Sequence, residues 1–134
     1  MKLYKNFNIL KNHKGSIILI GNFDGVHVGH QRLFKLANNY KKKFNLNIGV
    51  LTFEPMPKMF FNKEIKNLRI SNINQKNKIL KTLGVDFVIT QKFDKKFSKI
   101  KSDFFIKKIL SKKIEAKYIF VSNNFRFGNK REGD

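Results

Sequence analysis

Two histidines, His27 and His30, lie in a segment that also contains the glycines Gly21, Gly25 and Gly29. Imidazole rings donate hydrogen bonds to phosphate oxygens, and glycines allow a ligand to approach the backbone closely. The segment follows a short apolar run and leads into a helical pattern. Free backbone N–H groups and the positive end of a helix dipole would therefore face the same ligand. These residues predict a phosphate-binding site.

The histidine pair alone admits other interpretations. A metal site, a capped helix start or an ordinary surface segment each accommodates two histidines three residues apart. A metal site lacks a further ligand here, because the other histidine, His13, lies in the N-terminal arm and the chain contains no cysteine. The glycine pattern also differs from the G-x-G-x-x-G and G-x-x-x-x-G-K-[ST] fingerprints. A phosphate site in this chain would use a different scheme of recognition.

Short apolar runs alternate with helical patterns along the chain. We expect strands at residues 17–20, 48–53, 85–90 and 118–122, and helices at 32–40, from Ser71 or Asn72 to Gly84, and from Ser102 or Asp103 onward. Strands that alternate with helices predict an α/β fold with a mostly parallel sheet covered on both faces. Right-handed crossovers then place ligand sites at the carboxyl ends of the strands.

Helical spacing also predicts which side chains face the core. They are Leu33, Phe34, Leu36, Ala37 and Tyr40 in the first helix, Ile73, Ile79, Leu80 and Leu83 in the second, and Phe104, Phe105, Ile109 and Leu110 in the last. Pairs and triplets of lysine stand beside these apolar positions, as is typical of solvated helix faces.

Three unusual segments come directly after predicted strands, and they are residues 21–30, 52–57 and 123–134. Pro55 and Pro57 would end a strand in any context, so the second segment by itself needs no function. In the third segment, the rings of Phe125 and Phe127 either cradle a planar heterocycle or pin the loop to the core. The common position of the three segments at strand ends favours one shared ligand site.

The composition excludes several classes of protein. With 134 residues, 41% hydrophobic content and 15 phenylalanines, the chain predicts one globular domain. It has no cysteine for a disulfide framework. No apolar run approaches the ~20 residues of a membrane span, so we expect a soluble cytoplasmic protein. The net charge of +20 is typical of nucleic-acid binders, but the lysines are spread evenly, which favours compositional drift and makes nucleic-acid binding unlikely.

Together the three segments resemble the FAD synthetase (FMN adenylyltransferase) module of bacterial bifunctional riboflavin kinase/FAD synthetases. Gly21-Asn-Phe-Asp-Gly-Val-His-Val-Gly-His-Gln31 resembles the first motif of that family, a version of the HxGH signature of nucleotidyltransferases. Thr52-Phe-Glu-Pro-Met-Pro57 resembles the second motif, and Asn124-Phe-Arg-Phe-Gly-Asn-Lys-Arg-Glu-Gly-Asp134 resembles the third. Weaker similarity at residues 83–86 and 93–94 extends the likeness over nearly the whole chain. HxGH alone also occurs in pantetheine-phosphate adenylyltransferases and class I tRNA synthetases, whereas the three motifs in this order are specific to the family.

The resemblance implies a Rossmann-like three-layer nucleotidyltransferase fold and the reaction of ATP with FMN to give FAD and pyrophosphate, with Mg²⁺ arriving with ATP. The catalytic residues that it implies are His27, His30 and Asn124. The nucleotide pocket that it implies contains Gly21, Asn22, Phe23, Asp24, Gly25 and Gly29. The flavin contacts that it implies are Phe53, Pro55, Pro57, Phe125 and Phe127. Such a reaction needs positioning and charge stabilisation and no protein nucleophile.

The sequence departs from the family pattern in two respects. Ser122 stands where the family usually has glycine. The family continues past the position of Asp134 with a Ser/Thr-and-Arg segment that grips the nucleotide, and then with a riboflavin kinase module. We therefore expect residues 1–134 to form an FAD synthetase domain that is incomplete at its C-terminus, without the kinase domain. The alternatives are a nucleotidyltransferase with another phosphorylated acceptor, a non-catalytic remnant and a basic nucleic-acid-binding module.

Overall fold

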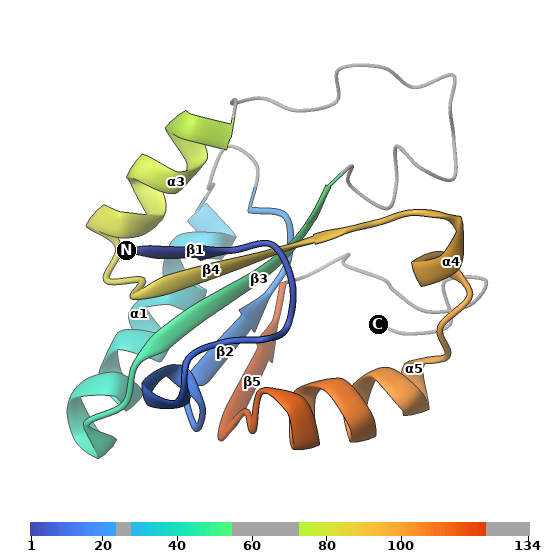
Figure 1. Ribbon diagram of the computed structural model, residues 1–134. Coiled ribbons are helices and arrows are strands. Elements are labelled where there is room, and N and C mark those ends of the chain that lie inside the picture. The colour runs from blue at the N-terminus through green and yellow to red at the C-terminus, as the bar shows by residue number, and fades with distance from the viewer. Residues whose placement is uncertain (24–27, 55–72, 123–134) are drawn as a thin grey trace.

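Five parallel strands form one sheet in the computed structural model, which describes residues 1–23, 28–54 and 73–122. The strand order is β1-β4-β3-β2-β5. The strands are β1 (Lys2–Tyr4), β2 (Ile17–Ile20), β3 (Ile48–Glu54), β4 (Phe87–Lys92) and β5 (Tyr118–Val121) (Figure 1). Every pair of neighbouring strands is parallel. The predicted α/β fold with a mostly parallel sheet is confirmed.

The central strands are buried on both faces. All of β2 is buried, and so is β3 up to Phe53, which explains why both strands are continuous apolar runs. Leu19 pairs with Val50 on one side and with Phe120 on the other. Strand β4 starts two residues later than predicted, because Val85 N–H still donates to the Leu80 carbonyl at the end of the preceding helix.

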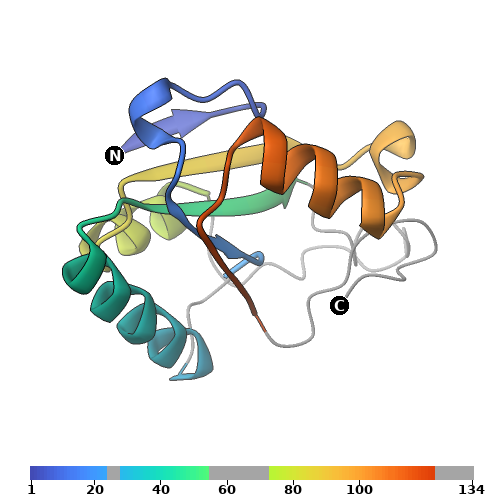
Figure 2. The same cartoon turned by 90° about the horizontal axis from the view of Figure 1, so that it is seen from below.

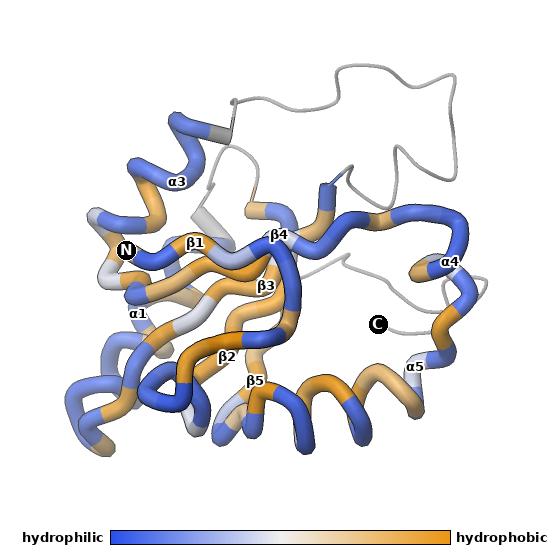
Figure 3. The backbone as a smooth tube through the Cα atoms, in the orientation of Figure 1, coloured by the Kyte–Doolittle hydropathy of each residue, from blue (hydrophilic) through white to orange (hydrophobic). Residues whose placement is uncertain are grey.

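Helices cover the sheet on both faces and give three layers (Figure 2). One face carries α1 (Val28–Phe44) and α3 (Ile73–Thr82), and the other carries α4 (Lys95–Ser98), α5 (Ser102–Phe104) and η2 (Phe105–Lys113). Phe34 and Leu80 belong to the first core, and Phe105 and Leu110 belong to the second, which also includes Phe7 of the N-terminal arm. Figure 3 shows the hydrophobic strands at the centre and long hydrophilic stretches on the helices.

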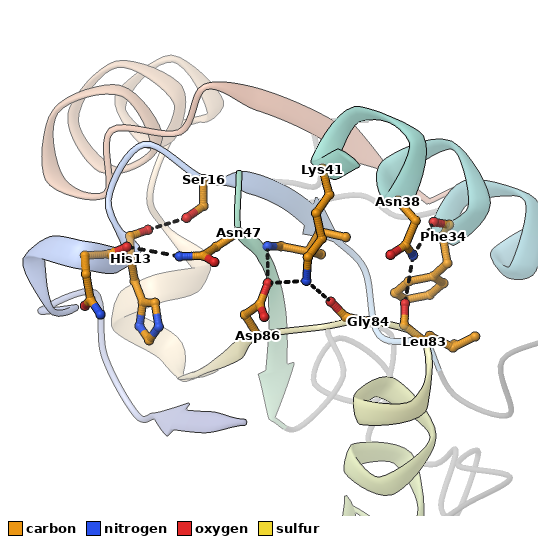
Figure 4. A network of polar contacts seen from close by, with 11 residues as sticks. His13, Ser16, Phe34, Asn38, Lys41, Asn47, Leu83, Gly84 and Asp86 are labelled. Atoms are coloured by element: carbon orange, nitrogen blue, oxygen red, sulfur yellow. Dashed lines mark hydrogen bonds and ion pairs between the residues drawn. The ribbon is translucent and has the colours of Figure 1, made fainter. Parts of the chain in front are cut away.

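A polar network ties α1 to the sheet at the amino ends of the strands (Figure 4). The Asp86 carboxylate accepts hydrogen bonds from the Lys41 ammonium group at 2.8 Å and from the Ile48 N–H at 2.9 Å. Lys41 Nζ also donates to the Gly84 carbonyl at 3.0 Å. Residues 83–86, one of the stretches of weaker family similarity, therefore fix the turn between α3 and β4 against α1 and β3.

The Phe87 ring packs closely against the backbone of Gly49, its register partner on β3. A Cβ atom on Gly49 would lie 2.8 Å from Phe87 Cε1 and still closer to two other ring atoms. His13, in the short helix η1 (Lys11–His13), stacks on the same ring with centroids 4.5 Å apart. A hydrogen bond of 2.6 Å joins His13 Nδ1 to the Tyr4 hydroxyl, and burial lowers the pKa of His13. This histidine therefore has a structural role in the N-terminal arm.

Three short elements were not predicted from the sequence: η1, β1 and α4. Strand β1 pairs with β4 through only three residues, from Lys2 opposite Phe87 onward, and so short an edge strand leaves no apolar run to recognise. Helix α4 has four residues and is capped by Asp94, whose Oδ1 accepts a hydrogen bond from Phe97 N–H at 2.8 Å. It is too short for helical periodicity, although aspartate is a preferred N-cap residue.

Helix α1 is longer than the predicted residues 32–40. It begins at Val28, so Gly29 and His30 lie in its first turn instead of in the preceding loop. It ends at Phe44, and Asn45 follows with a left-handed φ of 53°, a conformation that asparagine tolerates at a helix end. The lysines of its last turn interact favourably with the helix dipole, which supports the extension.

The last helix begins at Ser102 as predicted but soon becomes a π-helix, η2. Its wider turns appear in the hydrogen bond from Ile114 N–H to the Ile109 carbonyl, five residues earlier, at 3.0 Å. Phe105 is buried as predicted, but the prediction for Phe104 was wrong, since 51% of its surface is exposed. The predictions for Leu36 and Ile79 were also wrong, because both side chains are exposed on their helices.

Helix α3 ends near Gly84, as the sequence predicted. Gly84 has a φ of 90°, and its N–H donates to the Lys81 carbonyl at 3.2 Å, which is a common way to terminate a helix. The predicted cap at Ser71 or Asn72 lies outside the described residues. Among the helices of the three described ranges, none is both long enough and apolar enough to cross a membrane.

Gly49→Ala is expected to lower the free energy of unfolding by about 3 kcal/mol, because the added methyl group overlaps the Phe87 ring. Gly15→Ala is the matched control, since Gly15 has a φ of 78° but no atom within 4 Å of an added Cβ. The control should lose only about 1 kcal/mol, from backbone strain alone. Urea unfolding measures both losses, and equal losses in the two variants would contradict the packing account.

Candidate functional site

The strand order reverses between β2 and β5, so their carboxyl ends form a topological switch point of the sheet. The chain proceeds from β2 through β3 to β4 in one direction, and then returns so that β5 pairs with the other side of β2. Helix α1 follows β2 on one face of the sheet, and η2 leads into β5 on the opposite face (Figure 1, Figure 2). In parallel α/β sheets, ligands bind at such a switch point, outside the carboxyl ends of the strands.

Gly21 and Ser122 lie side by side at this switch point. Ser122 N–H donates to the Ile20 carbonyl at 2.9 Å, directly after the pairing of Ile20 with Val121. A Cβ atom on Gly21 would lie 2.9 Å from Ser122 Cβ and 3.1 Å from Phe23 Cζ. The structure therefore accommodates serine at position 122 only because residue 21 is glycine.

Phe23 lies beside the site and has an unusual backbone conformation. Its φ is 53°, in the left-handed region that costs a non-glycine residue about 1–2 kcal/mol. Its side chain is 1% exposed, and its ring contacts the rings of His30 and Phe34 at centroid distances of 5.0 and 5.2 Å. Burial of this ring offsets the strain, and the contact holds the imidazole ring of His30 in place.

Asn22 brings a polar side chain to the same turn. Its Oδ1 atom is buried and accepts no hydrogen bond from any residue that the structure describes. Buried polar atoms are satisfied in the great majority of cases, so such an atom calls for an explanation. A ligand or a ligand-bound ion at the switch point would supply the missing partner.

The first turn of α1 lies on the chain shortly after β2 and its switch point. This turn has no acidic residue, and the last turn carries Lys41, Lys42 and Lys43. The positive end of the helix dipole is therefore not neutralised by the side chains of the helix itself. His30 is half-buried in this first turn. Backbone and imidazole together suit an anion.

The described part of the second motif, residues 52–54, forms the end of β3. Thr52 and Phe53 are almost fully buried. The Phe53 ring contacts Phe93 at 5.6 Å and Phe97 at 5.4 Å between centroids. Phe53 therefore anchors the end of β3, and its predicted contact with a flavin remains a prediction.

The remaining predicted site residues lie outside the described ranges. They are Asp24, Gly25 and His27 of the first motif, Pro55 and Pro57 of the second, and Asn124, Phe125 and Phe127 of the third. For Gly29, only its place in the first turn of α1 is described. What the structure does bring together is Gly21, Phe23 and His30, with Asn22 beside them.

Lys76 is a buried residue at this edge that the sequence analysis missed. Its side chain is 4% exposed, and Nζ donates to Thr52 Oγ1 at 3.2 Å. Positions 73, 76, 80 and 83 have the spacing of an apolar helix face, and lysine is rarely found buried at such a position. A search for charged residues at core-facing helical positions would have found it.

The contact between residues 21 and 122 predicts that substitutions there are coupled. Gly21→Ala should lower the free energy of unfolding by about 2 kcal/mol, because its Cβ overlaps the Ser122 side chain. In a Ser122→Gly background, the same substitution should cost about 1 kcal/mol less. A double-mutant cycle by urea unfolding measures the difference, and strictly additive effects would contradict the contact.

The chain is similar to known proteins over its whole length. The FAD synthetase family matches residues 9–134. A bifunctional riboflavin kinase/FMN adenylyltransferase of Buchnera aphidicola subsp. Schizaphis graminum is 40% identical over 137 residues, which cover 100% of this chain and 43% of the relative. The protein of the same description from Escherichia coli (strain K12) is 36% identical over 136 residues, which cover 100% of this chain and 44% of the relative. The chain thus spans less than half the length of these curated relatives.

A solved structure shares the fold. The crystal structure of a macrolide-efflux protein from Streptococcus pneumoniae matches with a TM-score of 0.78 and 29% identity, over 98% of this chain and 43% of that chain. The region matched by the family includes β2, α1 and β5, the elements around the switch point. This match over residues 9–134, together with the similarity to the curated relatives, shows that the chain belongs to the FAD synthetase family.

Proposed function

We propose that this chain is an FMN adenylyltransferase, which joins the AMP part of ATP to FMN and releases FAD and pyrophosphate. The observation that carries the proposal is the position of the Gly21–Gln31 motif in a chain of the FAD synthetase family. The start of this motif follows β2 at the switch point, and the first turn of α1 contains its end. Both substrates carry phosphates, which the positive end of α1 attracts.

In this reaction, a phosphate oxygen of FMN attacks the α-phosphorus of ATP. A new P–O bond forms between the two, the bond from the α-phosphorus to the bridging oxygen breaks, and pyrophosphate leaves with the electron pair. No protein nucleophile is needed, so the protein contributes positioning and electrostatic stabilisation. In the proposal, His27 and His30 stabilise the charge that builds up on the phosphates, and Asn124 contacts the same groups.

Residues around the histidines would set their geometry. The buried Phe23 ring holds His30 at a centroid distance of 5.0 Å, which limits the orientations of its imidazole ring. Gly21 makes room for Ser122 and Phe23 at the start of the pocket, and Gly25 and Gly29 in the same motif would let the nucleotide approach the backbone. Asn22 and Asp24 complete the proposed pocket with polar groups.

Mg²⁺ would enter with ATP and neutralise phosphate charge when bound. The described residues suit such an ion, because Mg²⁺ prefers oxygen ligands and usually keeps several waters beside one or two protein groups. Asn22 Oδ1 is a buried oxygen atom without a hydrogen-bond partner among the described residues. It is the group of this chain that we propose for the ion or its waters.

The flavin would lie beside the second and third motifs. Pro55, Pro57, Phe125 and Phe127 are the proposed contacts, because proline and phenylalanine offer flat apolar surfaces to a planar ring. Phe53 would support them from the core, where its contacts with Phe93 and Phe97 fix the end of β3.

The test is FAD formation from FMN and Mg-ATP by the purified chain, followed by chromatography of the flavins. A His27→Asn/His30→Asn variant should form FAD at least about 100-fold more slowly, since groups that stabilise developing charge are worth this much or more. His13→Asn is the matched control, because His13 lies at the amino ends of the strands in contact with Tyr4 and Phe87. It should retain activity at a temperature where circular dichroism shows that it is folded.

Two outcomes would contradict the proposal. A folded parent chain that forms no FAD would contradict it directly. Adenylyl transfer to another phosphorylated acceptor, with FMN left unchanged, would identify a different nucleotidyltransferase.

A further inference from the structure

Lys76 is the charged side chain that the described part of the chain buries. The other polar side chains in the same burial class are Ser16, Thr52 and Ser122. Removing an ammonium group from water costs several kcal/mol unless hydrogen bonds and charges compensate for it. A methionine or leucine would fill this place on α3 without that cost. Burial of Lys76 therefore depends on specific contacts, and its hydrogen bond to Thr52 is one of them.

The hydrogen bond of Lys76 leads to the carboxyl end of β3. Nζ donates to Thr52 Oγ1 at 3.2 Å, and Thr52 is 1% exposed. Side chains alternate along a strand, so Thr52 points to the same face of the sheet as Val50, which belongs to the core beneath α1 and α3. The ammonium group is thus held between α3 and the sheet, one residue beyond the pairing of Leu51 with Ile20.

A second hydrogen bond continues from β3 to the glycine segment. The Leu51 carbonyl accepts from Gly21 N–H at 3.1 Å, and this carbonyl belongs to the peptide group that joins Leu51 to Thr52. A displacement of Thr52 therefore moves the acceptor of Gly21. Two hydrogen bonds and one peptide group connect Lys76 to the first residue of the histidine motif.

We propose that Lys76 is a positioning residue for adenylyl transfer, which holds the start of the Gly21–Gln31 motif in place through Thr52. The inference rests on the proposed function. The hydrogen bond from Lys76 to Thr52 is buried, so water does not compete for it and its loss is transmitted to the peptide group that Gly21 N–H contacts.

The experiment compares Lys76→Met with Lys76→Arg and Lys78→Met. Lys78 is exposed on the same helix, so its variant removes the same charge without the buried contact. Lys76→Met should lower kcat for FAD formation about 30-fold or more, because small displacements of reacting groups have effects of this size. Lys76→Arg should recover part of the loss, and Lys78→Met should stay within about twofold of the parent, as screening of exposed charges implies.

Hydrogen exchange of the Gly21 amide, measured by NMR without substrates, is the second readout. Lys76→Met and Thr52→Val should each accelerate this exchange about tenfold or more relative to the parent, because the Leu51–Thr52 peptide is no longer held. Lys78→Met should leave it unchanged. Thr52→Val removes the acceptor with little change of shape, so it also tests the contact if Lys76→Met does not fold.

The outcomes separate this inference from the proposed function. A parent chain that makes no FAD contradicts the proposed function, while the Gly21 exchange still tests the connection to Lys76. Unchanged exchange in both Lys76→Met and Thr52→Val overturns the positioning role. An unchanged kcat in a folded Lys76→Met variant overturns it as well.

Discussion

Parallel hydrogen bonding of β2 to β3 on one side and to β5 on the other is the constraint on which the rest of the structure depends. Because the strands are parallel, all their carboxyl ends lie at one edge of the sheet. Because β2 is followed by β3 on one side, whereas β5 joins its other side after β4, the strand order reverses between β2 and β5. Gly21, Phe23 and Ser122 lie at this switch point without long loops of their own.

The amino ends and the carboxyl ends of the strands differ in how well their polar groups are satisfied. At the amino ends, Asp86 and Lys41 join β3, α1 and the α3–β4 turn, and His13 closes the N-terminal arm over Phe87. These groups satisfy one another. At the carboxyl ends, by contrast, the chain gathers a strained Phe23, an Asn22 oxygen without a partner among the described residues, and a buried lysine. The strained backbone of Phe23 and the unsatisfied Asn22 oxygen are features typical of binding sites.

Much of this arrangement was predictable because the signals are local. Continuous apolar runs identified β2 and β3, and the glycines with two histidines identified the turn after β2. Features that depend on tertiary contacts were not predictable. Strand β1 exists because β4 offers an edge, and the start of α1 at Val28 was missed in a segment rich in glycine. Phe104 is exposed at the end of α5, where the helix becomes the π-helical η2, and Lys76 is buried where α3 packs on Thr52.

The central claim is that the nucleotide binds at the carboxyl edge, between β2 and β5. The most direct test is a map of backbone amide shifts by NMR during titration with a non-hydrolysable ATP analogue, Mg²⁺ and FMN. The account predicts shifts at residues 21–23, at His30, at residues 52–54 and at Ser122, with Ile48 and Asp86 unchanged. Shifts centred on the amino ends, or spread over the exposed lysines and abolished by salt, would contradict it.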